Sequence, residues 1–402
     1  MTLNVRHRSQ ALPCPEEAAR QVPFYRPDIG DAEIAAVVET LRSGWLTIGP
    51  RTQEFERRFA AFVGAPHAVA VNSCTAALHL ALNCLGIQSG DEVITSTLTF
   101  TATGATVLHA GGQLVLADVT PDTLNLNPED VERRITSRTK AIVAVHFAGH
   151  PAPMDALIQL ARAHNLFLVE DAAHALPAAY DGRKIGSIGD LTAFSFYATK
   201  NLCTGEGGML TTAREEWAEV LRTRRLHGMS RDAWRRYSNE GQWRYDVAYP
   251  GFKYNMTDIN AALGLVQLER LPALHRRRCE LADLYSRLLA DVEEVELPPT
   301  RQNVEHAWHL YVIRLRREML RIHRDAVMEE LRRAGIGTQV HFIPLHMHSY
   351  YRQALGVSPA EFPVASDAAE RIISLPLYTV MSDEDVAYVC DQLRRIVRAH
   401  RR

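Results

Sequence analysis

The segment from residue 166 to residue 209 reads LFLVEDAAHALPAAYDGRKIGSIGDLTAFSFYATKNLCTGEGGM and decides the fold. It begins with an apolar run, Leu166 to Asp171, that ends in two carboxylates. A second run, Leu191 to Tyr197, leads to Lys200 and a glycine-rich turn, and a third follows at Met209 to Thr212. Short runs of this kind are typical of strands that are covered on both faces. The segment therefore predicts strands of one sheet with charged residues near the strand ends.

Similar runs recur on the N-terminal side of this segment, and helical patterns separate them. The runs lie at Val69 to Val71, Glu92 to Thr95, Leu114 to Asp118 and Ala141 to Val145. The helical patterns lie at Asp31 to Leu41, Thr75 to Gly86, Pro128 to Ile135 and Met154 to His164. This alternation predicts an α/β fold with a mainly parallel sheet. In the first helix we expect Asp31 to be the N-cap, Gly44 to end the helix, and one apolar face made of Ile34, Val37, Val38 and Leu41.

The length of 402 residues suits one large domain and a smaller one. We expect an N-terminal extension over residues 1–24, a large domain over 25–272 and a small C-terminal domain over 273–402. A helical pattern at Asp258 to Leu271 is expected to end at Pro272. The C-terminal part contains a strand pattern and a helix pattern, at Leu310 to Leu315 and at Arg324 to Ala334 before Gly335. The irregular, aromatic stretch Gly228 to Pro250 is predicted to be a loop near the functional site.

Composition narrows the class of protein. Lys and Arg number 45 against 47 Asp and Glu, so no overall positive charge attracts nucleic acid or an anionic membrane. The six cysteines lack the spacing of a zinc site or a secreted disulfide framework. No signal-peptide pattern opens the chain, and no apolar run is long enough to span a membrane. We therefore expect a cytoplasmic protein with neither a nucleic-acid nor a membrane partner.

Several residues that can carry chemistry follow the predicted strands. Asp171 ends one strand, at the sheet edge where open α/β folds bind ligands, and His174 follows it. Lys200 lies between small and polar residues, where a desolvated amine has a lowered pKa and becomes a nucleophile. Taken alone, Asp171 could equally be a helix cap or a surface acid. Lys200 could equally be an ordinary ion-paired lysine.

The turn Asn72 to Ala76 completes the pattern. It places small residues at a helix start, where free backbone N–H groups favour a phosphate, although a capped helix explains it as well. An anion site, an acid, a lysine and the hydroxyl of Ser195 on loops of one sheet together predict a pyridoxal phosphate pocket. Two groups of histidines have no ligand partners at metal spacing, so we expect no metal site; they are His341, His346 and His348, and His146 and His150.

Long segments resemble the DegT/DnrJ/EryC1/StrS family of sugar aminotransferases, across nearly the whole chain. They include SGWLTIGPRTQEFE, VNSCTAALHLAL, GDEVITSTLTFTATGATV, the segment from Glu170 to Met209, GFKYNMTDINAALGLVQLERL, HAWHLYVIRL and ISLPLY. The resemblance implies a pyridoxal-phosphate enzyme of fold type I, similar to aspartate aminotransferase. Within the family, KYNMTDINAALG, HAWHLYVIRL and GIGTQVHFIPLH look most like the enzymes that make UDP-4-amino-4-deoxy-L-arabinose.

The resemblance also implies roles for individual residues. Lys200 would bond covalently to the cofactor and then shuttle a proton, and Asp171 would pair with the protonated pyridine nitrogen. His174 would support the ring near its phenolic oxygen, and Phe100 would stack on its face. The phosphate would be held by the backbone of Cys74 and Thr75 and by the hydroxyl of Ser195.

The remaining implications concern substrates and assembly. Asn255 would reach the phosphate of a neighbouring subunit, so a homodimer would share its active sites. An amino group would pass from L-glutamate to a keto group of a nucleotide-linked sugar, with C4 as the expected position and with His341 and the Gly228 to Pro250 loop as contacts. Phe342 stands where many members carry Tyr, which puts a hydroxyl contact there in doubt.

Three other functions remain open. They are an aminotransferase acting on a 3-keto sugar or a cyclitol, a related sugar dehydratase, and a non-catalytic regulator that kept the fold. In the dehydratase branch histidine replaces the lysine, so Lys200 argues against it. The retained Lys200, Asp171 and Ser195 argue against the regulator.

Overall fold

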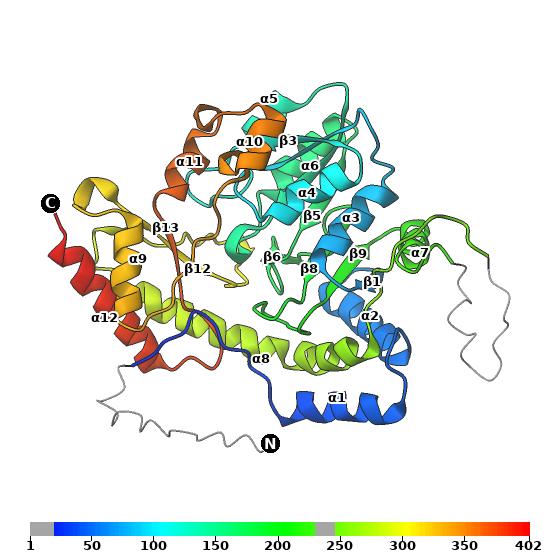
Figure 1. Ribbon diagram of the computed structural model, residues 1–402, viewed down its shortest axis with the longest axis horizontal. Coiled ribbons are helices and arrows are strands. Elements are labelled where there is room, and N and C mark those ends of the chain that lie inside the picture. Colours follow the sequence, from blue (N-terminus) through cyan, green and yellow to red (C-terminus); the bar gives the residue numbers. More distant parts are fainter. Residues whose placement is uncertain (1–19, 230–245) are drawn as a thin grey trace, which may run out of the picture.

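A seven-stranded sheet forms the centre of the computed structural model, which describes residues 20–229 and 246–402 (Figure 1). Its strands lie in the order β1-β9-β8-β5-β4-β2-β3. Their bounds are β1 His67–Val71, β2 Glu92–Ser96, β3 Gln113–Ala117, β4 Thr139–Val145, β5 Phe167–Asp171, β8 Leu191–Ser195 and β9 Gly208–Thr212. Strand β9 runs antiparallel to both of its neighbours, β1 and β8, and every other pair in this sheet is parallel. The predicted mainly parallel sheet is confirmed.

Helices cover both faces of this sheet, as the apolar strands require. Their bounds are α2 Pro50–Val63, α3 Cys74–Cys84, α4 Thr101–His109, α5 Pro128–Arg134, α6 Met154–Ala163 and α7 Glu215–Arg224. Helix α1, Asp31–Ser43, packs instead against the long helix α8, Asp258–Leu288. Alternate residues of a strand enter different cores. Val169 packs in the core that includes α3 and α4, whereas its neighbour Leu168 packs in the core that includes α5 and α6. A third core joins α2 to the outer strands.

Helix α1 has the predicted extent but not the predicted cap or buried face. Gly30 precedes the helix and its N–H donates to Glu33 Oε2 at 2.9 Å, so the expectation that Asp31 is the N-cap was wrong. Gly44 ends the helix as predicted, with a φ of 74°. Glu33 is buried, while Ile34 and Leu41 are 55% and 50% exposed in this single chain. Hydrogen bonds from Gln267 and Arg270 satisfy the buried carboxylate of Glu33.

Helix α8, Asp258–Leu288, continues through Pro272, so the expected change of element there was wrong. Its first half packs in the core beside α2 through Ala261, Leu265, Leu268 and Leu271. Its second half packs in the C-terminal core through Leu281, Ala282 and Tyr285. Proline removes one backbone hydrogen bond from a helix interior, and burial on both sides of Pro272 offsets that loss. Helix α8 therefore links the two parts of the molecule (Figure 1), and the division at residue 272 stays a prediction.

The C-terminal part has its own small antiparallel sheet in the order β10-β12-β13. Its elements are β10 Val295–Glu296, β12 Tyr311–Leu315, β13 Ile372–Leu375, α9 Arg324–Arg333, α10 Ser349–Leu355, α11 Pro363–Ala369 and α12 Asp383–Ala399. A further small sheet contains β6 Ala179–Tyr180, β7 Arg183–Lys184 and β11 Val304–Glu305. The predicted strand near 310–315 and the predicted helix before Gly335 are confirmed. Val22 packs in the C-terminal core and pairs with Ile336.

None of the helices in the described ranges is both long and apolar enough to cross a membrane.

Candidate active site

A cavity of about 460 Å³ lies beside the ends of β5 and β8. The segments around it are the start of α3, the loop after β5, the loop between β8 and β9, and a part of the C-terminal region. Its lining includes Ser73, Cys74, Thr75, Phe100, Asp171, His174, Ser195, Lys200, His309, His341 and Phe342. The fold thus gathers all the predicted site residues except Asn255.

Lys200 lies in the loop between β8 and β9, and its N–H donates to the carbonyl of Tyr197 at 2.9 Å. Part of the side chain is exposed within the cavity, yet its amine is desolvated. Burial lowers the pKa of Lys200 to about 8, although the nearby groups Cys74 and Asp171 act to raise it. A larger fraction of Lys200 is therefore neutral near pH 7 than for an exposed lysine. That state allows nucleophilic attack on a carbonyl carbon.

Asp171 is the last residue of β5, and its side chain is almost fully buried. Burial raises the pKa of Asp171, while hydrogen bonds from Thr103 Oγ1 at 2.8 Å and Ala173 N–H at 3.2 Å oppose the rise. Thr103 donates to Asp171, so Thr99 donates in turn to Thr103 at 2.7 Å. Both direct donors are neutral. The carboxylate is thus held in one orientation and would gain stability from a cationic partner.

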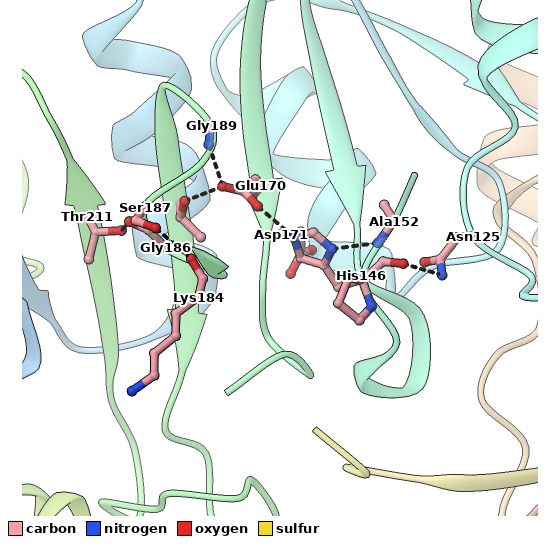
Figure 2. Close-up of polar contacts among 12 residues, drawn as sticks. Asn125, His146, Ala152, Glu170, Asp171, Lys184, Gly186, Ser187, Gly189 and Thr211 are labelled. Atoms are coloured by element: carbon pink, nitrogen blue, oxygen red, sulfur yellow. Dashed lines mark hydrogen bonds and ion pairs between the residues drawn. The ribbon is translucent and has the colours of Figure 1, made fainter. Parts of the chain in front are cut away.

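Glu170, which precedes Asp171 in β5, forms a buried pair with His146 (Figure 2). This pair holds the end of the strand in place. His146 Nδ1 accepts a hydrogen bond from Ala152 N–H at 2.9 Å, so Nε2 carries the ring proton and donates to Glu170 at 3.0 Å. Glu170 also accepts from Gly189 N–H and Thr192 Oγ1, each at 2.7 Å. Burial alone would raise the pKa of Glu170, but these donors outweigh it and lower that pKa. These contacts anchor β5 where Asp171 enters the cavity.

The start of α3 is the place where the sequence predicts an anion site. Ser73 is the N-cap, and its Oγ accepts from Ala76 N–H at 3.1 Å. The N–H groups of Cys74 and Thr75 belong to the first turn, where a helix offers them no partner. A Cβ built on Gly208 would lie 2.6 Å from Ser73 O and 2.8 Å from Cys74 N. Only glycine at position 208 lets β9 approach this helix start so closely.

Aromatic and histidine rings also line the cavity. His174 stacks on Phe342 with ring centroids 5.6 Å apart, and burial lowers the pKa of His174 well below its ordinary value. Phe100 is 57% exposed, and its ring lies 5.9 Å from that of Phe342. His341 contacts Ser374 Oγ through Nδ1 at 2.9 Å. Burial lowers the pKa of His341 to about 4, and Lys200 adds to this shift.

The residues present fit pyridoxal phosphate. Asp171 is a buried carboxylate with neutral donors, which suits a protonated pyridine nitrogen. The close approach that Gly208 permits leaves the N–H groups of Cys74 and Thr75 at the cavity, where they suit a phosphate. The desolvated amine of Lys200 opens on the same cavity and suits the aldehyde carbon. Three chemically different ends of the cofactor thus meet matching groups in one cavity.

Two predictions lie wholly or partly outside this cavity. Asn255 does not line it; its Oδ1 accepts from Lys253 Nζ at 2.6 Å, and its side chain is buried in the single chain. The role of Asn255 toward a second subunit stays a prediction. Most of the Gly228 to Pro250 loop falls outside the described residues, and Met229 pairs with Val247 across its ends.

Sequence reasoning missed His309, Asn201 and Thr103. His309 contacts the Lys200 amine, Asn201 contacts His309, and Thr103 holds Asp171. Thr103 shares helix α4 with Thr101 and Thr106, and no sequence spacing singles it out as a partner of Asp171. The histidine pair in HAWHLY was the only signal for His309, since it lies 109 residues from Lys200. In the described ranges no group of three His, Cys, Asp or Glu side chains could hold a metal.

Known proteins resemble this chain along most of its length. The model of the DegT/DnrJ/EryC1/StrS aminotransferase family matches residues 27–394. The spore coat polysaccharide biosynthesis protein SpsC of Bacillus subtilis is 52% identical, over 94% of this chain and 97% of that protein.

Solved structures agree with this result. The putative sugar aminotransferase Spr1654 from Streptococcus pneumoniae, in its PMP form, has a TM-score of 0.89 and 38% identity over 94% of this chain and 100% of that one. Its PLP form gives a TM-score of 0.88. Helicobacter pylori PseC, an aminotransferase involved in the biosynthesis of pseudoaminic acid, has a TM-score of 0.88 and 29% identity over 94% of this chain and 100% of that one. The chain therefore belongs to the DegT/DnrJ/EryC1/StrS aminotransferase family, whose members are pyridoxal-phosphate enzymes of fold type I.

Proposed function

We propose that this aminotransferase moves an amino group from L-glutamate to the C4 keto group of a nucleotide-linked sugar. The observation that carries the proposal is the meeting of Lys200, Asp171 and the start of α3 at one cavity. The cofactor, when bound, stores the amino group between the donor and the acceptor substrate.

Each residue has a physical task in this proposal. Lys200 Nζ would hold the cofactor and, as a free amine, would take and return a proton, which a pKa of about 8 allows near neutral pH. Asp171 holds the pyridine nitrogen in its charged form through its buried negative charge. Cys74 and Thr75 bind the phosphate through backbone N–H groups, and Ser195 adds a hydroxyl. His174 and Phe100 confine the ring.

The sugar substrate rests on different support. SpsC, Spr1654 and PseC carry names that refer to polysaccharide, sugar and pseudoaminic acid. The motifs that resemble enzymes of 4-amino-4-deoxy-arabinose synthesis favour a 4-keto sugar on a nucleotide. We assign His341 a contact with this sugar, and two observations support the assignment: the ring lines the cavity, and burial keeps it neutral at pH 7. Phe342 offers no hydroxyl, so any hydrogen bond to the sugar at this position comes from another residue.

A homodimer completes the proposal. Ile34 and Leu41 on α1 and Leu46 after it are exposed in the single chain, at 55%, 50% and 45%. Large apolar side chains gathered on one helix and its exit suit a second copy of the chain. We propose that the partner subunit supplies Asn255 to the phosphate site. The cytoplasm remains our expectation for where the enzyme works.

Incubation with [15N]glutamate and a panel of sugars tests the function. The panel contains UDP- and dTDP-linked 4-keto and 3-keto sugars and a keto cyclitol, and mass spectrometry reads the products. The proposal expects 15N in a 4-amino sugar, and Lys200→Ala should abolish the label. Label only in a 3-amino sugar or an aminocyclitol would reject the C4 assignment in favour of those alternatives. No label in any product, with a cofactor spectrum that glutamate leaves unchanged, would favour the non-catalytic regulator.

A further inference from the structure

His309 contacts the reactive amine from the C-terminal side of the cavity. It is buried, and its Nε2 lies 3.4 Å from Lys200 Nζ. Its chain segment is anchored on both sides, because Ala307 N–H donates to Gly149 O at 2.9 Å and Leu310 N–H donates to Ala148 O at 3.1 Å. Arg278 donates to the carbonyl of Trp308 at 3.1 Å. The ring of His309 therefore has a fixed place beside the lysine.

Gly149 makes this close packing possible. Its φ of 98° is a conformation that favours glycine. A Cβ at position 149 would lie 2.8 Å from His174 O and 3.1 Å from His309 N. The backbone at Gly149 thus touches the segments that carry two of the histidines at the cavity.

Asn201 determines which nitrogen of His309 carries the proton. Its Nδ2 donates to Leu176 O at 2.9 Å and to Ala307 O at 2.7 Å, which fixes the orientation of the amide. Oδ1 then faces His309 Nδ1 at 3.3 Å, and an amide oxygen can only accept. Nδ1 of His309 therefore carries the proton, and Nε2 presents a lone pair to Lys200.

We propose that His309 is a positioning residue that accepts a hydrogen bond from the Lys200 ammonium, with its tautomer set by Asn201. The inference rests on the proposed role of Lys200 and deepens it. Burial lowers the pKa of His309 well below its ordinary value, and the nearby Lys200 adds to this shift, so the ring stays neutral. A neutral acceptor stabilises the charged amine and aims Nζ into the cavity. An exposed or protonated histidine does neither.

Other charged and titratable groups surround the pair and share in its titration. Desolvation has the largest effect on the pKa of His309 and on the pKa of Lys200. The remaining groups that act on one or both are Cys74, Asp171, His174, Arg278 and His341. A variant of His309 that leaves all five in place isolates its own contribution.

Competitive acetylation of the cofactor-free full-length protein tests the proposal. The rate of acetylation of each lysine is followed from pH 6 to pH 10 by peptide mass spectrometry, with the exposed Lys140 as internal reference. His309→Asn keeps a donor for Asn201 but loses the acceptor at Nε2. We expect His309→Asn to lower the pH midpoint of Lys200 acetylation by about one unit. The reason is that the desolvated Lys200 ammonium loses its hydrogen-bond acceptor. His309→Gln places an oxygen near the old Nε2 and should restore most of the shift.

The acetylation experiment does not require the protein to be catalytically active. A Lys200 midpoint that is unchanged or raised in His309→Asn would overturn the proposal. A second measurement uses 15N-labelled histidine in the wild-type protein, where the nitrogen shifts must report a proton on Nδ1 of His309; a proton on Nε2 would equally overturn it. Failure of the aminotransferase proposal has a different signature, namely no 15N in any product and a cofactor spectrum that glutamate leaves unchanged.

Discussion

Buried, neutral histidines are a property of this site at the scale of single residues. Burial is the main cause that lowers the pKa values of His174, His309 and His341, to about 4 in the case of His341. All three line the cavity. A protonated histidine there would repel the Lys200 ammonium, so the site works with these rings uncharged.

The stability of the protein should therefore depend on pH in a defined direction. Below pH 6.5 the unfolded chain binds protons on these histidines, while the folded chain does not until lower pH. The unfolded state then binds more protons, so stability falls as pH falls, by about 1.4 kcal/mol per pH unit for each such histidine. We expect the urea midpoint of the cofactor-free protein to fall less between pH 6.5 and 5 in His341→Asn than in the wild type.

His164→Asn is the matched control, because His164 is exposed. Its urea midpoint should follow the wild type across the same pH range. Identical pH dependence in His341→Asn and the wild type would show that His341 is already protonated in the folded state, against this account.

Sequence reasoning located the residues of the site that follow strand ends. Asp171 and Lys200 could be predicted because strands of one sheet bring their ends together. His309 could not be ranked among the histidines, because its role depends on a contact with Lys200 and on the tautomer that Asn201 sets. The Glu170–His146 pair was equally hidden, since it depends on which way each side chain leaves its strand.

At the scale of elements, the approach of β9 to the start of α3 shapes the proposed phosphate site. The φ of Gly208 is not in the left-handed region, so alanine at this position causes no backbone strain. Its Cβ would clash with the backbone of Ser73 and Cys74. Gly208→Ala should push β9 and the α3 start apart, and we expect weaker cofactor binding by about tenfold, roughly the loss of one charge-assisted hydrogen bond. Equilibrium dialysis or fluorescence titration with pyridoxal phosphate measures it.

Gly30→Ala provides the comparison for this substitution. A Cβ at Gly30 meets only Glu33 Oε2, at 3.4 Å, and this position lies at α1 rather than at the cavity. Its cofactor affinity should equal that of the wild type. Equal affinities for Gly208→Ala and the wild type would mean that the α3 start does not bind the phosphate.

Element boundaries were harder to predict where distant residues decide them. The sequence offers Asp31 as a cap, yet Gly30 is the N-cap, and its N–H donates to Glu33 in the first turn. Helix α8 supplies the partners that hold this buried carboxylate there. Pro272 reads as a helix end, yet α8 continues because two separate cores hold its halves. Both errors arise from tertiary contacts that override local signals.

At the scale of the whole molecule, the proposal of shared active sites predicts complementation. Lys200→Ala and Asn255→Ala should each be nearly inactive alone as dimers. In a mixed dimer, the chain with intact Lys200 receives intact Asn255 from its partner, so one of two sites is complete. Unfolding and refolding an equal mixture should restore about a quarter of wild-type activity, since half of randomly paired dimers are mixed.

Light scattering on each sample checks that dimers form. Dimers without restored activity would mean that Asn255 serves its own subunit or none. Sequence reasoning anticipated the mainly parallel sheet and the strand at 310–315, because these strands are continuous apolar runs. It did not foresee that this strand belongs to a small antiparallel sheet. It did not foresee that α1 leaves Ile34 and Leu41 exposed, because helical periodicity marks an apolar face without naming what covers it.

The covalent bond between Lys200 and pyridoxal phosphate is the central claim, and peptide mapping tests it most directly. The other lysines of the chain are Lys140, Lys184 and Lys253, so the assignment is unambiguous. The cofactor-loaded protein is reduced with borohydride, digested and analysed by mass spectrometry. We predict the added mass of the reduced cofactor on the peptide that contains Lys200 and on no other. Modification of a different lysine, or of none, would contradict the account.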